Sequence, residues 1–227
     1  MATPNLSSPI LFSPDELKSN PDLSASVLRL VNNAFYRSKE SNPIQWCNTT
    51  LRFPNEDALH TLLSPPNSVI ALIFDMNSNV ELPQDLNPEI VGVDKPEHKS
   101  KKIVACAAAV PWKGGWAQEG AGTESGWEIK IVSVDGDAKY LRRGLAVQIL
   151  EALEHRLVSD MDLHLRKEAV GAGEATLTLW ILAAESLTGA YWRKKGYREV
   201  RKKIEGAGVW SCKTSFEMVV FRKDVRV

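Results

Sequence analysis

This chain of 227 residues lacks most features that mark a secreted, metal-binding or membrane-spanning protein. Its three cysteines, Cys47, Cys106 and Cys212, are far apart, with no Cys-x-x-Cys pair or suitably spaced histidine. This argues against a disulfide framework and a zinc site. No apolar run approaches the ~20 residues of a membrane span, and the N-terminus has no basic segment followed by an apolar core. We therefore expect a protein of a reducing compartment, cytoplasmic or alternatively nuclear, with no membrane partner.

An excess of charge of one sign is also missing. Lys plus Arg and Asp plus Glu each number 28, so no overall basic field exists to gather nucleic acid. We expect no nucleic-acid partner, and any basic site must be local. An apolar share of 44% with 25% charged residues is typical of a soluble globular protein, here a monomer or homodimer.

The stretch that organises the chain is residues 127–157, where a strand passes through a polar turn into a helix. The strand is rich in β-branched residues, and the helix carries apolar residues at a helical period. The turn ends in Arg142-Arg143-Gly144. Backbone amides at a helix start are unpaired, and here glycine lets a ligand approach two guanidinium groups. The turn therefore favours an anion, above all a phosphate, although a solvated arginine pair is the alternative.

Helix and strand patterns alternate along the rest of the chain, which predicts a mixed α/β (α+β) class. We expect helices over 22–37 (capped by Asp22 or Ser24), 55–63 and 185–195. We expect strands over 68–74, 102–111, 128–134, 175–183, 197–203 and 216–222. Residues 1–20 are predicted to form an N-terminal arm, and 21–227 a single domain with insertions near 75–101 and 112–126. Residues 159–174 are expected to be a loop or a frayed helix extension.

Two segments carry a family resemblance. Leu141-Arg142-Arg143-Gly144-Leu145-Ala146 resembles the Gln/Arg-x-x-Gly-x-Gly/Ala pyrophosphate-binding signature of the GNAT superfamily of acyl-CoA-dependent N-acyltransferases. Downstream, residues 191–197 (YWRKKGY) resemble the aromatic-aromatic-x-x-x-Gly-aromatic ending of that family's next helix. The segments have the expected order, and the resemblance covers roughly residues 22 to 221. Leu141 departs from the signature because it has no side-chain donor.

The resemblance implies a GNAT-like sheet, mostly antiparallel, flanked by helices, with splayed parallel central strands at 128–134 and 176–183. The pantetheine arm of acetyl-CoA would enter the gap, and helix 22–37 would border the acceptor side. No metal is implied. The implied cofactor contacts are Val132, Val134, Leu141, Arg142, Arg143, Gly144, Leu145, Ala146 and Val147, with Glu185, Ser186, Tyr191 and Trp192 further along.

Transfer of an acyl group to an amine requires the neutral amine. A lysine-like amine of pKa ~10.4 costs roughly 4–5 kcal/mol to deprotonate at pH 7, so a carboxylate base in the cleft would help. Glu128 lies six residues before Val134, an offset similar to that of the general-base glutamate in the histone-modifying branch of the family. A strand period of two would place Glu128, Lys130, Val132 and Val134 on one face. The alternative is a structural salt bridge between Glu128 and Lys130.

The position of the family's leaving-group acid is less regular. Many GNAT enzymes use a tyrosine four residues before the last glycine, and that position is Trp192 here, whose indole is not a practical acid. Tyr191 is adjacent but points about 100° away on a helix. Either Tyr191 takes this role in a shifted helix, or CoA leaves as a thiolate. The alternative is that both aromatic side chains pack the core.

Two function hypotheses follow. The first is an acetyl-CoA-dependent N-acetyltransferase acting on a primary amine of a small molecule or peptide. The second is a GNAT-like domain that binds or senses acyl-CoA, or scaffolds a partner, without catalysis, as Leu141 and Trp192 suggest. A different nucleotide-binding α/β domain is less favoured, because Gly-x-Gly-x-x-Gly and a Walker lysine are missing. The sequence does not identify the amine.

Overall fold

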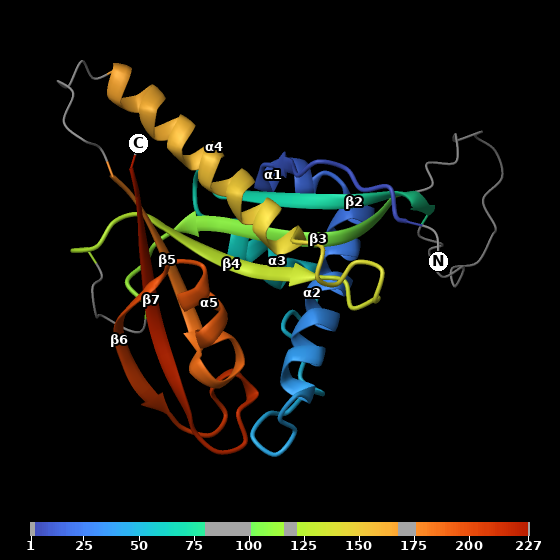
Figure 1. The fold of residues 1–227 in the computed structure, drawn as a ribbon, viewed down its shortest axis with the longest axis vertical. Helices are drawn as coiled ribbons and strands as arrows, with labels where there is room; N and C mark the ends of the chain where they lie inside the picture. Colours follow the sequence, from blue (N-terminus) through green and yellow to red (C-terminus); the bar gives the residue numbers. More distant parts are fainter. Residues whose placement is uncertain (1–2, 80–100, 116–121, 168–175, 227) are drawn as a thin grey trace.

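The computed structural model describes residues 3–79, 101–115, 122–167 and 176–226, in which seven strands form one sheet (Figure 1). The strands are β1 (Ile10–Phe12), β2 (Val69–Asn79), β3 (Lys101–Pro111), β4 (Trp127–Val134), β5 (Thr176–Ala184), β6 (Arg198–Glu205) and β7 (Phe216–Arg226). The helices are α1 (Pro14–Lys18), α2 (Pro21–Glu40), α3 (Glu56–Leu63), α4 (Leu145–Lys167) and α5 (Ala190–Lys194), with a π-helical turn η1 (Glu185–Gly189) and a 3₁₀ turn η2 (Val209–Ser211).

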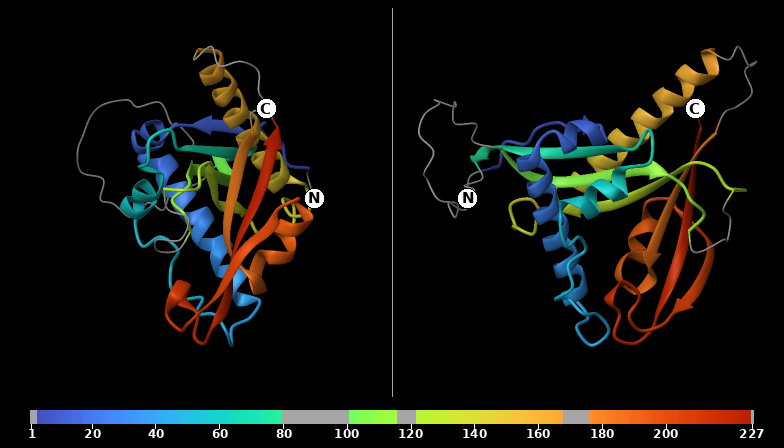
Figure 2. Two further views of the ribbon diagram at one scale, coloured as in Figure 1. Left: turned by 90° about the vertical axis from the view of Figure 1, so that its left-hand side faces the viewer. Right: turned by 180° about the vertical axis from the view of Figure 1, so that it is seen from behind.

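The strand order is β1-β2-β3-β4-β5-β7-β6, and every pairing except β4–β5 is antiparallel. This confirms the predicted mixed class with a parallel centre. Figure 2 shows that β5, β6 and β7 turn away from β1–β4, so the sheet opens between β4 and β5.

Helices cover both faces of the β1–β4 half of the sheet. Ile149, Leu153 and Leu157 of α4 pack on one face, and α2 and α3 pack on the other. The alternation of β2 explains the two layers, because Ile73 belongs to the α4-side cluster and Leu72 to the α2-side cluster. Both sides of these strands are therefore buried core.

Helix α2 begins earlier and ends later than the periodicity predicts. The Asn20 side chain accepts a hydrogen bond from the Leu23 amide at 3.1 Å, so Asn20 is the N-cap and Pro21 occupies the first turn. The predicted caps, Asp22 and Ser24, lie inside the helix. The C-terminal end reaches Glu40, which brings the last turn of α2 to the opening between β4 and β5.

The first twenty residues, predicted as an arm, contribute elements to the sheet and its cover. Ile10 pairs with Leu72 in the β1–β2 ladder, and Leu17 of α1 is fully buried. Ser13 and Glu16 form a capping box at the start of α1. This segment therefore packs as an edge of the domain.

Strand β2 continues to Asn79, so the first part of the predicted 75–101 insertion belongs to the sheet. There the Asp75 carboxylate is 1% exposed and accepts hydrogen bonds from Tyr140 Oη at 2.6 Å and from Ser78 Oγ at 2.8 Å. Residues 80–100 and 116–121 of the two predicted insertions lie outside the described residues. Helix α4 extends to Lys167, which makes residues 159–167 helical, and 168–175 again lie outside the described part.

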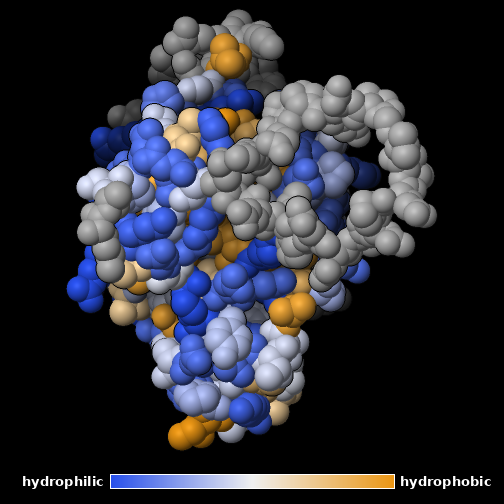
Figure 3. Space-filling view, turned by 90° about the vertical axis from the view of Figure 1, so that its right-hand side faces the viewer, coloured by the Kyte–Doolittle hydropathy of each residue, from blue (hydrophilic) through white to orange (hydrophobic). Residues whose placement is uncertain are grey.

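Hydrophilic residues cover most of the described surface visible in Figure 3, and hydrophobic residues form small separate groups there. No helix within residues 3–79, 101–115, 122–167 and 176–226 is long and apolar enough to cross a membrane.

Candidate active site

The candidate site is the gap where the two parallel strands diverge. Strands β4 and β5 pair only at Trp127–Leu179 and Glu128–Trp180, and beyond these pairs a cleft of about 340 Å³ separates them. Its walls come from β4, β5, the end of α2, the segment 46–52 and the turns near 187–192 and 210–211. Segments far apart in the chain thus form one cavity.

A rigid cluster holds the strands together where they still pair. A Cβ at Gly126 would lie 2.2 Å from the Thr178 carbonyl oxygen, so only glycine allows this approach. The Trp180 indole donates to the Ser125 carbonyl at 2.8 Å and stacks on Trp112 at 4.9 Å between ring centroids. These contacts fix the closed end from which the cleft widens.

Strand β4 carries a β-bulge in the wall of the cleft. Cys106 of β3 pairs with Ser133, whereas Ala108 pairs with Lys130, so β4 has one extra residue between these pairs. Ile131 has φ of 51°, a left-handed conformation that β-branched residues rarely adopt. The bulge interrupts the backbone ladder beside the gap.

The bulge also changes which side chains share a face. Ile129 packs in the α4-side cluster, so Glu128 and Lys130 project to the other face, whereas Val132 and Val134 pack against the α4-side cluster. The prediction that these four alternate residues share one face is wrong, because the extra residue shifts the alternation by one. Val132 still lines the cleft.

Glu128 lies in the cleft wall and is 7% exposed. Lys130 Nζ donates to its Oε1 at 2.5 Å, so the ion pair considered from the sequence is present. The contact occupies one of the two carboxylate oxygens, and a carboxylate has further lone pairs that can accept a hydrogen bond. The base role of Glu128 stays a prediction.

The start of α4 has the features of an anion site. Gly144 precedes the helix with φ of +75°, and a Cβ built on it meets nothing within 4 Å. The amides of Val147 and Gln148 bond to the Gly144 carbonyl, whereas those of Leu145 and Ala146 have no backbone partner in the described chain. The first turn of α4 contains no acidic residue. Unpaired amides, an open approach and the helix dipole favour a phosphate here.

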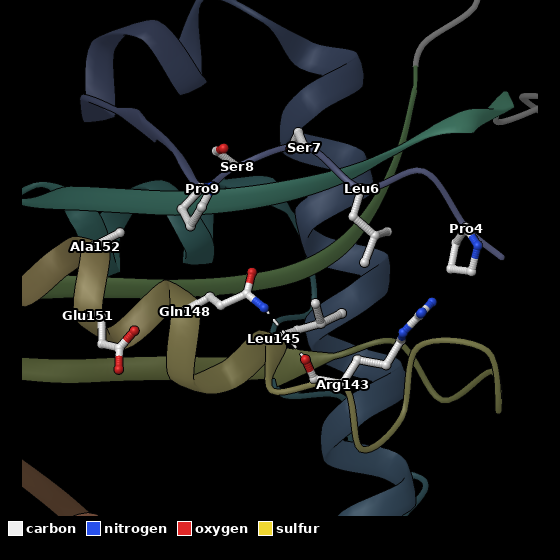
Figure 4. Close-up of a pocket in the computed structure, with 10 residues that line it drawn as sticks. All are labelled: Pro4, Leu6, Ser7, Ser8, Pro9, Arg143, Leu145, Gln148, Glu151 and Ala152. Atoms are coloured by element: carbon white, nitrogen blue, oxygen red, sulfur yellow. Dashed lines mark hydrogen bonds between the residues drawn. The ribbon is translucent and has the colours of Figure 1, made fainter.

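The other residues of this turn that were predicted to contact the cofactor differ in their exposure. Leu145 is 2% exposed, so only its backbone is available, whereas Leu141 is 44% exposed. Arg142 is exposed with φ of 60°. Arg143 lines a hollow of about 640 Å³ between residues 4–9 and α4 and extends toward Pro4 (Figure 4).

The aromatic pair is divided between the cleft and the core. Trp192 is 6% exposed and lines the cleft, with its ring against Tyr197 at 5.4 Å. Tyr191 packs against the core, and its hydroxyl is buried without a hydrogen-bond partner among the described residues. Burial raises the pKa of Tyr191. The π-helical turn η1 directly precedes α5, which is the place of the shifted helix considered from the sequence. Even so, Tyr191 is not among the residues that line the described cleft.

Glu185 and Ser186 make structural contacts. The Glu185 carboxylate binds Arg193 through two contacts of 2.6 and 3.0 Å and lies directly over Gly189. Ser186 Oγ donates to Gln45 Oε1 at 3.2 Å. The cleft is lined instead by the next two residues, Leu187 and Thr188.

Four side chains that line the cleft near the end of α2 and the 210–211 turn were not predicted: Lys39, Trp46, Arg52 and Trp210. Lys39 had a usable signal, because it continues the four-residue spacing of Val27, Val31 and Phe35 on the packed face of α2. Burial lowers the pKa of its ammonium group. Trp46 and Arg52 lie in loops and Trp210 lies in the three-residue turn η2, and segments of these kinds have no apolar periodicity to interpret.

No group of three or more His, Cys, Asp or Glu side chains within the described residues could hold a metal ion.

Comparison with known proteins identifies the fold. No protein-family model and no curated protein matches this sequence. A putative acetyltransferase from Acinetobacter baylyi superposes with a TM-score of 0.56 at 11% identity, over 99% of this chain and 94% of that chain. A GNAT-family acetyltransferase from Streptococcus pneumoniae superposes with a TM-score of 0.50 at 14% identity, over 97% of this chain and 99% of that chain. Arabidopsis thaliana NAA60 in complex with a bisubstrate analogue superposes with a TM-score of 0.50 at 10% identity, over 96% of this chain and 99% of that chain. The chain therefore has the fold of the GNAT-family N-acetyltransferases.

Proposed function

We propose that this protein is an N-acetyltransferase that transfers the acetyl group of acetyl-CoA to a primary amine. The observation that carries the proposal is the cleft between diverging β4 and β5, which contains a carboxylate, together with the open helix start at Gly144 that follows β4 in the chain. A thioester in the cleft and a pyrophosphate at the helix start would use both features at once.

The cofactor would be held mainly by backbone groups. The amides of Leu145 and Ala146 would donate to the pyrophosphate, with Arg142 beside them. The pantetheine arm would extend along Val132 between the strands. Because the β3–β4 register skips a residue at Ile131, backbone amides at the bulge would be available to the thioester carbonyl oxygen.

In the transfer, Glu128 would accept a proton from the ammonium form of the acceptor. The neutral nitrogen would attack the thioester carbon, the C–S bond would break, and CoA would leave as the thiolate, while the nitrogen would lose its second proton to solvent as the amide forms. A thiol of pKa near ~8.5 is an adequate leaving group without a protein acid, so Trp192 is compatible with turnover. Trp192 would then pack beside the thioester.

The first experiment is calorimetry with CoA and acetyl-CoA. We expect binding by wild type and loss of binding by Gly144→Val. Gly122→Val is the matched control, because Gly122 also has positive φ (+77°) and nothing within 4 Å of its Cβ. A well-folded wild type without CoA affinity would refute the proposal, whether the protein is an enzyme or a sensor.

The second experiment measures thiol release from acetyl-CoA against a panel of amines. Glu128→Gln should lower turnover by ~10²-fold or more with little change in acetyl-CoA affinity, and activity should recover at high pH. Glu151→Gln, on α4 beside the hollow of Figure 4, is the control. Tight acetyl-CoA binding with no transfer to any amine or peptide would favour the non-catalytic alternative.

A further inference from the structure

The end of the cleft beside α2, where the acceptor would bind, holds a buried lysine that has no carboxylate partner; the Cys47 thiol is the acidic group whose charge acts on it. Lys39 lies in the last turn of α2, is 8% exposed and lines the cleft. Its ammonium group forms no ion pair or side-chain hydrogen bond with any residue in the described ranges. Burying an ammonium group is unfavourable unless an anion accompanies it.

A second cation stands at the same end. Arg52 is an exposed residue that lines the cleft, with its guanidinium over the rings of Phe35 at 5.5 Å and Phe53 at 5.2 Å. It has no carboxylate within ion-pair distance in the described part of the chain. The aromatic faces orient the group without neutralising it.

Charge within the cleft is unbalanced. The charged residues that line it are Lys39, Arg52, Lys130 and Glu128. Glu128 is already bound to Lys130 at 2.5 Å. Apart from this pair, Lys39 and Arg52 have no carboxylate within 4.0 Å among the described residues, and the charge of Glu128 reaches Arg52 only from a longer distance.

A further donor adds to this excess. Trp46 lines the cleft, is 1% exposed, and its indole N–H has no hydrogen-bond partner among the described residues. The segment around Trp46 is fixed by hydrogen bonds to the β6–β7 loop, from the Cys47 amide to the Ser211 carbonyl at 2.9 Å and from the Lys213 amide to the Gln45 carbonyl at 2.8 Å. This end of the cleft therefore presents two cations, Lys39 and Arg52, and one neutral donor, the Trp46 indole, whose segment is fixed by hydrogen bonds.

We propose that the acceptor is a small amine that carries an anionic group, a carboxylate or a phosphate, which Lys39 and Arg52 bind while the amine faces Glu128. This inference rests on the proposed acetyl transfer and specifies its substrate class. A zwitterionic acceptor complements both halves of the cleft, because its ammonium meets the carboxylate and its anion meets the unpaired cations. The cleft volume of about 340 Å³ suits a small molecule.

The test compares amines that differ only in the anionic group. Tyrosine and tyramine, tryptophan and tryptamine, and arginine and agmatine form the carboxylate pairs, and O-phosphoethanolamine and ethanolamine form the phosphate pair. In wild type we expect kcat/KM to be ~10–100-fold higher for the anionic member of at least one pair, the range for one charge-assisted hydrogen bond. The pair type with the larger ratio identifies the anion.

Variants assign the preference to residues. Lys39→Met should raise KM for the anionic amine ~10-fold or more, with little effect on the neutral analogue or on KM for acetyl-CoA. Lys39→Arg should retain much of the preference, and Arg52→Gln should weaken it as Lys39→Met does. Arg29→Met removes a charge from the same helix outside the cleft and is the control.

Outcomes separate this inference from the function on which it rests. Calorimetry of the CoA-bound protein with the anionic amines measures acceptor binding without turnover. If wild type binds CoA and acetylates amines but treats charged and neutral members alike, or accepts only peptides, the substrate class is wrong and the enzyme remains. An unchanged preference in both Lys39→Met and Arg52→Gln would also overturn it. Absence of CoA binding would instead remove the proposed function.

Discussion

Replacing Gly126 by alanine adds one methyl group where β4 and β5 still touch. Gly126 has φ of +118°, outside the regions that residues with a side chain favour, and the new Cβ would lie 2.2 Å from the Thr178 carbonyl oxygen. Backbone in such a region costs ~1–3 kcal/mol, and relieving the overlap costs a further ~1–3 kcal/mol. The two strands must separate or tilt to accept the methyl group.

A total loss of about 4 kcal/mol would lower Tm by roughly 8–16 °C in a chain of this length. The assay is thermal unfolding followed by circular dichroism, together with calorimetry of CoA binding at a temperature where the variant is folded. We expect CoA affinity to fall as well, because the cleft begins directly beyond the Gly126–Thr178 contact.

Two other glycines separate the contributions. Gly122 has φ of +77° and nothing within 4 Å of its Cβ, so Gly122→Ala reports backbone strain without a clash. Gly206 has neither positive φ nor a close neighbour, so Gly206→Ala should leave Tm nearly unchanged. If Gly126→Ala melts no lower than Gly122→Ala, the strands can relax around the methyl group and the steric argument fails.

Three further predictions concern single groups. Hydrogen bonds from neighbouring threonines lower the pKa of Cys47 to about 7, whereas burial raises the pKa of Cys106 to about 12. Alkylation of the folded protein by iodoacetamide should therefore reach half its maximal rate near pH 7 at Cys47 and should spare Cys106. A midpoint at the ordinary thiol pKa would contradict this. Tyr140→Phe should lower the free energy of unfolding by about 1–3 kcal/mol in urea titrations at pH 7, because the buried Asp75 carboxylate loses a donor. Burial alone would raise the pKa of Asp75, but its hydrogen bonds outweigh this effect and hold the pKa below the usual range. The difference in unfolding free energy between wild type and Tyr140→Phe should therefore be full above pH ~4 and should shrink as pH falls through the lowered pKa. A constant difference across that range would count against the argument. Tyr191→Phe removes a buried hydroxyl that has no hydrogen-bond partner in the described residues, so Tm should stay unchanged or rise. Thiol release should change little. A ~10²-fold loss of thiol release would instead identify Tyr191 as the leaving-group acid.

Apolar periodicity predicts the elements that form the cleft to within a few residues. The helix expected over 22–37 spans 21–40, and the strand expected over 175–183 spans 176–184. These elements bury one face or both, so their patterns reflect their packing directly. Strand β1 and helix α1 are three and five residues long, too short for a period to appear, and they are held by tertiary contacts with β2 and the core.

The bulge shows why the site itself was harder to predict. Ile131 is β-branched and would ordinarily indicate a regular strand, yet it has positive φ. The extra residue is defined only relative to β3, and nothing in the β4 sequence marks it. Its effect is large for one residue, because it moves Val132 and Val134 to the opposite face from Glu128.

Similar reasoning applies to Trp46 and Arg52. Each lies in a loop with no periodic pattern. Arg52 is held near the cleft by hydrogen bonds between its neighbour Phe53 and Asn32 of α2. Trp46 is held there by the contact with the β6–β7 loop. That contact joins residues about 165 positions apart, as in the bond from Lys213 to Gln45. Single-sequence patterns contain no information at such a separation.

The position of β7 has a consequence for biosynthesis. This strand is formed by residues 216–226 but lies between β5 and β6 in the sheet, so β6 has no edge to join until β7 is in place. On the ribosome, residues 3–134 can begin to assemble β1–β4 and α2 early, because those pairings are between segments already made. The side of the cleft that depends on β7 and the β6–β7 loop must wait for residue 226 to emerge. Until then the nascent chain carries an exposed β5 edge, where chaperones would be expected to bind.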